Sequence, residues 1–341
     1  MKAIAYYNFG SPDVLQCEDI EKPVPKSNEV LIKVRAASVN PLDRGELKGV
    51  PFIFRIVFGL RKPKATRPGR PGVDVAGLVE AVGRNVTEFK PGDEVFGVCI
   101  SNPHNSGVKV WVHEHGAFAE YACAPESTLV LKPDNVTFEQ AAAVPIAALT
   151  ALQGLRDKGH IQPGQRVLIH GAGGGVGTFA VQIAKSFGAD VTGVSRRSSV
   201  EMVRSIGADQ VIDYIQEDFT KSGQRYDLIF DCYASHPLSA CRRVLNPRGV
   251  YVRIGTPVNA SGIGILARLI QMLLLSRLTS QKLITFVAKP SKEDLTVLRE
   301  LMAAGKVTPV IDKRYSLSEV PEAVRYLEEG HARGKVVITV E

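Results

Sequence analysis

A glycine-dense stretch between Arg166 and Lys185 constrains this chain more than any other part of its sequence. The apolar residues 167–169 predict a buried strand, and a helix with an apolar face is expected over 176–187. Between them lie five glycines, at positions 171, 173, 174, 175 and 177. Because glycine has no Cβ, it lets backbone N–H groups approach a ligand closely. A strand that enters a helix through such a turn directs the helix N-terminus at an anion.

The anion expected at this turn is the pyrophosphate of a dinucleotide. The residues that fit the dinucleotide-binding pattern are Ala172, Gly173, Gly174, Gly175, Val176 and Gly177, an A-x-G-x-x-G variant with alanine in the first position. A turn that merely tightens the corner between strand and helix is the alternative. The strand and the helix on either side, which the pattern requires, favour the dinucleotide.

Two arginines after the next expected strand bear on which dinucleotide binds. In such a unit, an acidic residue about twenty positions past the glycines selects NAD through the ribose 2′-hydroxyl. This chain has Ser195, Arg196 and Arg197 there, after an expected strand at 190–194. Guanidinium groups suit a 2′-phosphate, which accepts charge-assisted hydrogen bonds from them. We therefore predict NADPH as the cofactor, with two ordinary surface arginines as the alternative.

Charge and cysteine usage exclude several classes of protein. The 341 residues carry a net charge of +7, but no basic block alternates with aromatic residues, so nucleic acid is not an expected partner. Five scattered cysteines without a C-x-x-C pair argue against a disulfide scaffold or a structural zinc site. The N-terminal residues lack the features of a signal or transit peptide, and we expect a cytoplasmic protein.

The pattern of apolar residues changes near position 135. Residues 1–130 contain short alternating segments separated by Pro and Gly, which predict a barrel-like β domain. Beyond 135, strands alternate with helices, which predicts a doubly wound parallel sheet and an α/β fold class. The apolar segment 262–278 is too short to span a bilayer. It is expected to pack on the sheet or a second subunit, or to meet a lipophilic substrate or a membrane.

Several short motifs occur in a characteristic order along the whole chain. They are Ala37–Asp43, Pro71–Gly77, Pro91–Asp93, Ala148–Leu152, Gly207–Asp209 and Gly334–Val336. With the glycine turn, they resemble the zinc-free quinone oxidoreductase (zeta-crystallin-like) branch of the medium-chain dehydrogenase/reductase superfamily. The resemblance implies a GroES-like catalytic and substrate domain over 1–132 and 306–341. It also implies a Rossmann NADP-binding domain over 133–305.

Zinc ligands are missing at the positions where zinc-using relatives carry them. Asn40 stands in place of the cysteine, Val73 and Asp74 in place of His-Glu, and 145–148 offers no third ligand. Without zinc there is no Lewis acid to activate an alcohol, which favours reduction of an acceptor that is already electrophilic. We expect no metal.

The resemblance implies hydride transfer from NADPH to a lipophilic quinone, or to the activated C=C of an enone or enal. It places Asn40 near the nicotinamide and the acceptor, although an asparagine that caps the turn before Pro41 is the alternative. The remaining expected cofactor contacts are Thr150, Phe286 and Val287 at the nicotinamide, Gly255 in the cofactor cleft, Lys335 at the edge between the domains, and Tyr214 at the adenosine phosphate.

The acceptor class stays open at this point. Many zinc-free relatives carry a lysine where this chain has Gly45, and the apolar loop 51–70 is either a lipophilic substrate lining or a core helix with a solvated tail. A carbonyl or alcohol dehydrogenase of the same superfamily is one alternative function. A non-catalytic protein that binds NADPH is another. Relatives pair the edge strands of their Rossmann sheets, so we expect a homodimer.

Overall fold

The computed structural model describes residues 1–49, 68–100, 116–254, 272 and 279–341. The chain divides into two compact units. The first unit comprises Met1–Ile146, Pro290–Ala304 and Pro309–Glu341, and the second comprises Ala147–Lys289 and Gly305–Thr308.

A mixed sheet forms the centre of the first unit. Its strand order is β14-β15-β3-β4-β5-β7, and β6 pairs with β3. Only β14 and β15 are parallel to each other; the other neighbours are antiparallel. The strands are β3 (Glu29–Val39), β4 (Asp74–Val82), β5 (Glu94–Val98), β6 (Tyr121–Pro125), β7 (Leu129–Leu131), β14 (Ile311–Ser316) and β15 (Lys335–Thr339), with a separate hairpin of β1 (Lys2–Ala5) and β2 (Gln16–Asp19).

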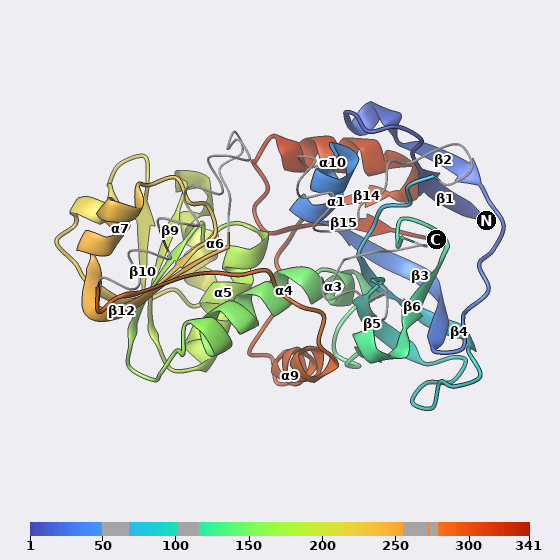
Figure 1. Cartoon of the computed structure of the whole chain (residues 1–341), viewed down its shortest axis with the longest axis horizontal. Helices are drawn as coiled ribbons and strands as arrows, with labels where there is room; N and C mark the ends of the chain where they lie inside the picture. Colours follow the sequence, from blue (N-terminus) through green and yellow to red (C-terminus); the bar gives the residue numbers. More distant parts are fainter. Residues whose placement is uncertain (50–67, 101–115, 255–271, 273–278) are drawn as a thin grey trace. The chain divides into compact units, whose positions relative to one another are not determined.

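Helices cover this sheet and close its core. They are α1 (Pro41–Leu47), α3 (Phe138–Ala142), α9 (Lys292–Ala303) and α10 (Val320–Glu328). Helices α1 and α10 lie side by side, and α3 packs on β3 and β4 (Figure 1). The core contains Ile4, Ile32 and Phe118, all of which are fully buried.

The second unit is built on a sheet of six parallel strands. The order is β10-β9-β8-β11-β12-β13, which confirms the predicted doubly wound parallel sheet. The strands are β8 (Arg166–His170), β9 (Asp190–Ser195), β10 (Gln210–Asp213), β11 (Tyr226–Asp231), β12 (Leu245–Arg253) and β13 (Lys282–Thr285). The chain moves outward in opposite directions from β8 and β11. Ligands of such sheets bind outside the carboxyl ends of the strands at this switch point.

The helices of the second unit follow the strands as expected. They are α5 (Gly175–Ser186), α6 (Val200–Ser205) and α7 (Leu238–Arg243). Helix α4 (Pro145–Leu152) enters the unit and continues into a π-helical turn, η3 (Gln153–Lys158). Single 3₁₀ turns are η1 (Pro12–Val14), η2 (Glu126–Thr128), η4 (Arg197–Ser199), η5 (Phe219–Lys221) and η6 (Leu317–Glu319).

The division into units differs from the expected bounds at three places: residues 133–146 and 290–304 belong to the first unit, and residues 306–308 belong to the second. Helix α3 belongs to the first unit because it packs on β3 and β4, and α9 belongs there because it packs on β7. Neither α9 nor β14 was expected from the sequence, although the buried residues Leu295, Leu298 and Met302 of α9 have helical spacing.

Two expectations fall on residues that the structure does not describe. The loop 51–70 lies outside the described residues up to position 67, and the segment 262–278 lies outside them except for Met272. Among the helices that are described, none has both the length and the apolar composition needed to cross a membrane.

Candidate functional site

The glycine turn directly follows β8, at the switch point of the parallel sheet. A Cβ on Gly177 would lie 2.0 Å from the carbonyl oxygen of Gly171 and 2.8 Å from Cα of Ala172, so the turn has no space for a side chain there. Helix α5 begins at Gly175, after the extended N-cap residue Gly174. The first N–H groups of a helix have no intrahelical partner, and the helix dipole adds positive potential at this end. The turn therefore offers an anion site.

The arginines predicted to select the cofactor follow β9, next to the glycine turn. A Cβ on Gly173 would lie 3.6 Å from Cβ of Ser195, the buried last residue of β9. Arg196 is half-buried and Arg197 is exposed. The N–H of Tyr214 donates to the carbonyl oxygen of Ser195 at 3.1 Å, and the Tyr214 side chain is 50% exposed. The structure thus brings the predicted phosphate-binding residues together at adjacent strand ends.

We call this surface, made of residues 171–177, 195–197 and 214, the phosphate end. It fits the pyrophosphate and the 2′-phosphate of NADPH. Backbone N–H groups at the start of α5 suit a pyrophosphate, and the guanidinium groups after β9 suit a 2′-phosphate.

A buried polar network lies directly below the glycine turn. His170 Nδ1 lies 2.8 Å from Asp231 Oδ1, and the Tyr251 hydroxyl donates to Asp231 Oδ2 at 2.6 Å. The N–H groups of Tyr233 and Ala234 also donate to Asp231 Oδ1. Burial opposes ionisation of Asp231, but the hydrogen bond and charge of His170, with the other donors, lower the pKa of this carboxyl to about 2. The network fixes the ends of β8 and β11, the strands on either side of the switch point.

The loop after β11 adds polar residues that no sequence motif indicated. The Ser235 hydroxyl lies 3.5 Å from His170 Nε2 and 3.1 Å from His236 Nδ1, and His236 Nε2 lies 3.3 Å from Asp218. Serine, histidine and aspartate therefore do come together here. The contact from Ser235 to His170 is at the outer limit of a hydrogen bond. From the sequence, the one available signal for Ser235, His236 and Asp218 is that each follows the end of a strand within five residues.

Apart from Asn40, the residues expected at the nicotinamide belong to the second unit. Thr150 is half-buried on α4. Phe286 and Val287 directly follow β13; Phe286 is half-buried and Val287 is 60% exposed. Gly255 lies outside the described residues. The exposed Val287 shows that the end of β13 has a face accessible to a ligand.

In the first unit, Lys335, Asn40 and Asp74 form a buried cluster at the ends of β15, β3 and β4. Lys335 Nζ lies 2.6 Å from Asn40 Oδ1 and 3.5 Å from Asp74 Oδ2. Asp74 Oδ2 also accepts from the Ser38 hydroxyl at 2.7 Å and from Asn40 Nδ2 at 2.9 Å. Lys335, Asn40 and Asp74 are 3%, 2% and 0% exposed. We call these four residues the Lys335 cluster.

The Asn40 side chain has a fixed orientation within this cluster. Its Nδ2 donates to Asp74 and, at 3.3 Å, to the carbonyl oxygen of Ser38, while its Oδ1 accepts from Lys335. Asn40 also precedes α1, and its N–H donates to Asp43 Oδ2 at 2.7 Å. Burial lowers the pKa of the Lys335 ammonium, although the charges of Asp74 and Asp43 oppose this shift.

The positions that carry zinc ligands in zinc-using relatives do converge in space. Asn40 Nδ2 and the Ile146 N–H both donate to Asp74. The cluster, however, combines a single carboxylate with an amide and an ammonium group, and this donor set does not fit zinc, which needs several nitrogen, sulfur or carboxylate ligands. Throughout the described ranges, no group of three or more His, Cys, Asp or Glu side chains could hold a metal ion.

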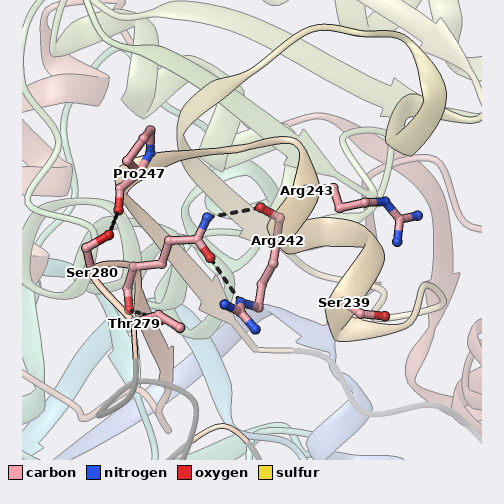
Figure 2. A pocket seen from close by; sticks show the side chains of 7 residues that line it. Ser239, Arg242, Arg243, Pro247, Thr279 and Ser280 are labelled. Atoms are coloured by element: carbon pink, nitrogen blue, oxygen red, sulfur yellow. Dashed lines mark hydrogen bonds between the residues drawn. The ribbon is translucent and has the colours of Figure 1, made fainter.

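A hollow of about 350 Å³ lies on the second unit. Figure 2 shows the side chains that line it, which are Ser239, Arg242, Arg243, Pro247, Thr279, Ser280 and Gln281. Arg242 Nε donates to Gln281 Oε1 at 3.0 Å, and the Gln281 amide donates back to the Arg242 carbonyl oxygen. Because Thr279–Gln281 precede β13, the hollow lies at the amino ends of the strands. It is therefore distinct from the phosphate end.

Comparison with known proteins agrees with this arrangement. Residues 26–134 match the alcohol dehydrogenase GroES-like domain, and residues 206–338 match the zinc-binding dehydrogenase family. The 2-methylene-furan-3-one reductase of Solanum lycopersicum is 36% identical over 99% of this chain and 79% of its own length. The chain belongs to the medium-chain dehydrogenase/reductase superfamily.

Further members of the superfamily resemble the chain over nearly its whole length. The chloroplastic NADPH-dependent alkenal/one oxidoreductase of Arabidopsis thaliana is 35% identical, over 99% of this chain and 79% of its own length. The quinone oxidoreductase of Escherichia coli, solved in complex with NADPH, is 25% identical with a TM-score of 0.79, and the match covers 99% of this chain and 100% of that one. These matches confirm the predicted family and its two-domain α/β fold.

Proposed function

We propose that this member of the superfamily is an NADPH-dependent reductase, which transfers hydride without zinc to a quinone or to the activated C=C of an enone or enal. The observation that carries the proposal is the phosphate end, where Arg196 and Arg197 follow β9 next to the glycine turn. The names of the relatives, which include an alkenal/one oxidoreductase and a quinone oxidoreductase, support the same reaction class.

When bound, NADPH supplies the hydride, and the chain has to bind it, orient it and exclude water. In this proposal the N–H groups from Gly174 to Gly177 bind the pyrophosphate. Ser195, Arg196, Arg197 and Tyr214 hold the 2′-phosphate end. Thr150, Phe286 and Val287 hold the nicotinamide, and Gly255 lines the cofactor cleft. Asn40, whose orientation the Lys335 cluster fixes, acts toward the nicotinamide and the acceptor, and Lys335 contacts the cofactor at the edge between the domains.

The donor set at positions 40 and 74 supports the zinc-free form of the reaction. Oxidation of an alcohol requires a group that lowers the pKa of its hydroxyl, and zinc provides this in metal-dependent enzymes. A quinone or an enone is already electrophilic and needs no such activation. The proposal therefore favours these acceptors over simple aldehydes, and it disfavours the oxidation of alcohols.

We further propose a cytoplasmic homodimer. Among the described strands, β13 is at the edge of the parallel sheet, and an edge strand with unpaired N–H and C=O groups can pair with a second copy. Light scattering coupled to size-exclusion chromatography tests the stoichiometry. A monomer at micromolar concentration contradicts the dimer.

The function is tested by NADPH oxidation with quinones, alkenals, cyclic enones and aldehydes, with NADH and EDTA controls. Replacing Arg196 and Arg197 together by Gln should raise the KM for NADPH by about tenfold or more, because two charge-assisted contacts are lost. Arg204→Gln is the matched control, since Arg204 is an exposed arginine on α6 that pairs with Glu201. Unchanged affinity in the double variant contradicts the NADPH assignment.

The acceptor screen and the EDTA control have their own outcomes. Tight NADPH binding without turnover of any acceptor indicates a non-catalytic protein. Loss of activity with EDTA contradicts the zinc-free reaction.

A further inference from the structure

Gln153, the first residue of the π-helical turn η3, clamps a distant backbone segment. Its Nε2 donates to the carbonyl oxygen of Lys289 at 2.8 Å, and the Lys289 N–H donates to its Oε1 at 2.9 Å. The side chain is 7% exposed, so both ends of the amide are held in a buried environment. Hydrogen bonds of this kind fix a segment strongly, because a buried donor or acceptor that lacks a hydrogen bond destabilises the folded state.

The clamped segment is the one that follows β13. It runs from Phe286 to Lys289 and contains Val287, which is 60% exposed. Gly154, the next residue of the π-helical turn, lies beside Phe286 at the other end of this segment. A Cβ on Gly154 would lie 3.2 Å from Phe286 Cε1 and 2.2 Å from Phe230 Cε2, so the Phe286 ring packs where Gly154 leaves space.

The π-helical geometry brings these two contacts to one place. The Gly159 N–H donates to the Gly154 carbonyl oxygen at 2.8 Å, which is the i to i+5 bond of a π-helix. Such turns are rare and occur frequently at functional sites. Here the turn directly continues α4, the helix that carries Thr150.

We propose that Gln153 is a positioning residue for the nicotinamide half of NADPH. It acts through the backbone of residues 286–289 and does not touch the cofactor. The inference rests on the proposed function, in which Phe286 and Val287 hold the nicotinamide. Without the clamp the segment moves, and the nicotinamide half of NADPH loses its contacts while the phosphate end keeps its own.

The same unit contains a matched control. Gln182, on α5, makes the same two-point clamp on Thr308: its Nε2 donates to the Thr308 carbonyl oxygen at 3.0 Å, and the Thr308 N–H donates to its Oε1 at 2.8 Å. Gln182 is also 7% exposed. Lys289 and Thr308 are both the last residue of the second unit before the chain enters the first. The two clamps hold different segments and share their two hydrogen bonds to the backbone, their burial and their place in the chain. Gln182 Nε2 also donates to the Thr178 carbonyl oxygen of its own helix at 3.0 Å.

The experiment compares Gln153→Met and Gln182→Met with two probes, NADPH and 2′,5′-ADP, which has both phosphate positions and no nicotinamide. Titration calorimetry of the full-length protein should show NADPH affinity about tenfold weaker in Gln153→Met, as expected for the loss of one set of contacts, and 2′,5′-ADP affinity unchanged. The kcat at saturating NADPH should also fall, in addition to any rise in the KM for NADPH, because hydride transfer depends on nicotinamide orientation. Gln182→Met should leave both affinities and kcat near wild type.

Several results would overturn the inference. Equal weakening of both probes in Gln153→Met, or an equal effect of Gln182→Met, assigns the clamp a general structural role. If Gln153→Met does not fold, Gln153→Asn keeps a buried amide that is too short to reach Lys289 and must show the same split between the probes. Wild-type protein that binds neither probe contradicts the proposed function itself, and the inference with it.

Discussion

The phosphate end of the second unit and the Lys335 cluster of the first unit both consist of polar groups at strand ends. They differ in whether these polar groups are available to a ligand or are already hydrogen-bonded to one another. At the phosphate end, the first N–H groups of α5 have no intrahelical partner, and Arg197 is exposed. In the Lys335 cluster, Asp74 Oδ2 accepts from Ser38 and Asn40, and the Asn40 amide is held on both sides. The first arrangement can bind a ligand directly, whereas the second mainly fixes its own geometry.

This difference predicts different responses to mutation. Changes in the Lys335 cluster should act first on the free energy of unfolding, because its charges are buried and mutually compensated. Changes at the phosphate end should act first on affinity for the dinucleotide. Binding of 2′,5′-ADP and thermal unfolding, measured on the same variants, separate the two responses.

The largest expected effect is that of Lys335→Met. Removing one partner of a buried ion pair costs about 3–5 kcal/mol, because it leaves the other charge uncompensated, and Asp74 is fully buried. Unfolding monitored by calorimetry should show this loss, while affinity for 2′,5′-ADP stays at the wild-type value. The double variant Lys335→Met with Asp74→Asn should recover part of the stability, because no buried charge is left unpaired.

Lys90→Met is the control for Lys335→Met, since Lys90 is an exposed lysine of the same unit. It should change the unfolding free energy by less than about 0.5 kcal/mol. If Lys335→Met is as stable as Lys90→Met, the cluster does not stabilise the unit. A large loss of 2′,5′-ADP affinity in Lys335→Met would remove the distinction between the two regions.

The second prediction concerns Gly177→Ala at the phosphate end. The new Cβ would meet the Gly171 carbonyl oxygen at 2.0 Å, so the backbone of the turn has to shift, at a cost of about 2 kcal/mol. Because the shift moves the N–H groups of the turn, affinity for 2′,5′-ADP should fall by about tenfold or more. Fluorescence titration measures the affinity and calorimetry measures the stability.

Gly174→Ala distinguishes a steric clash within the turn from a steric clash with the bound ligand. A Cβ on Gly174 has ordinary contact, with the Gly171 carbonyl oxygen at 3.5 Å, so the fold should be unaffected. Its stability should match the wild type, and any loss of affinity then reports crowding of the ligand. Wild-type affinity in Gly177→Ala would show that the turn does not bind the dinucleotide.

The comparison also explains which parts of the site could be predicted from the sequence. The phosphate end is local: its glycines and arginines follow two consecutive strands, so strand patterns and motif spacing place them. The Lys335 cluster joins β3, β4 and β15, and Lys335 is 295 residues from Asn40. The family resemblance gave Asn40 and Lys335 separate places, and nothing in the local pattern indicated that Lys335 is buried against Asn40.

The contacts that support the site were the least predictable. Gln153 and Lys289 are 136 residues apart, and no motif marks either of them. His170 and Asp231 end neighbouring strands, but their pairing follows from the strand order β8-β11, which a sequence without homologues does not reveal. Such side chains act through tertiary packing, and local propensity carries no information about them.

The smallest predicted effect is at Tyr251, below the phosphate end. Its hydroxyl donates to the Asp231 carboxylate at 2.6 Å, and a hydrogen bond to a charged group contributes about 1.5 kcal/mol, so Tyr251→Phe should lose about this amount near neutral pH. The pH dependence follows from the pKa of Asp231, which lies at about 2 in the folded chain and at 3.8 ordinarily. The folded state therefore binds this proton more weakly than the unfolded state. The stabilisation is complete above 3.8 and is lost as the pH falls to about 2.

Loss of the Tyr251 hydroxyl should raise the pKa of Asp231 toward 3.8, so wild type and Tyr251→Phe should differ most above that pH and converge as the pH approaches 2. Tyr226→Phe is the matched control, because Tyr226 is fully buried in the same unit and its hydroxyl donates to the neutral amide of Gln224 at 3.2 Å. Its effect should have no pH dependence in this range. Chemical denaturation at a series of acidic pH values measures both variants. A constant difference between wild type and Tyr251→Phe across the series would show that Asp231 does not carry the acid sensitivity. The network under the glycine turn would then be held by packing, in contrast to the charge pairing of the Lys335 cluster.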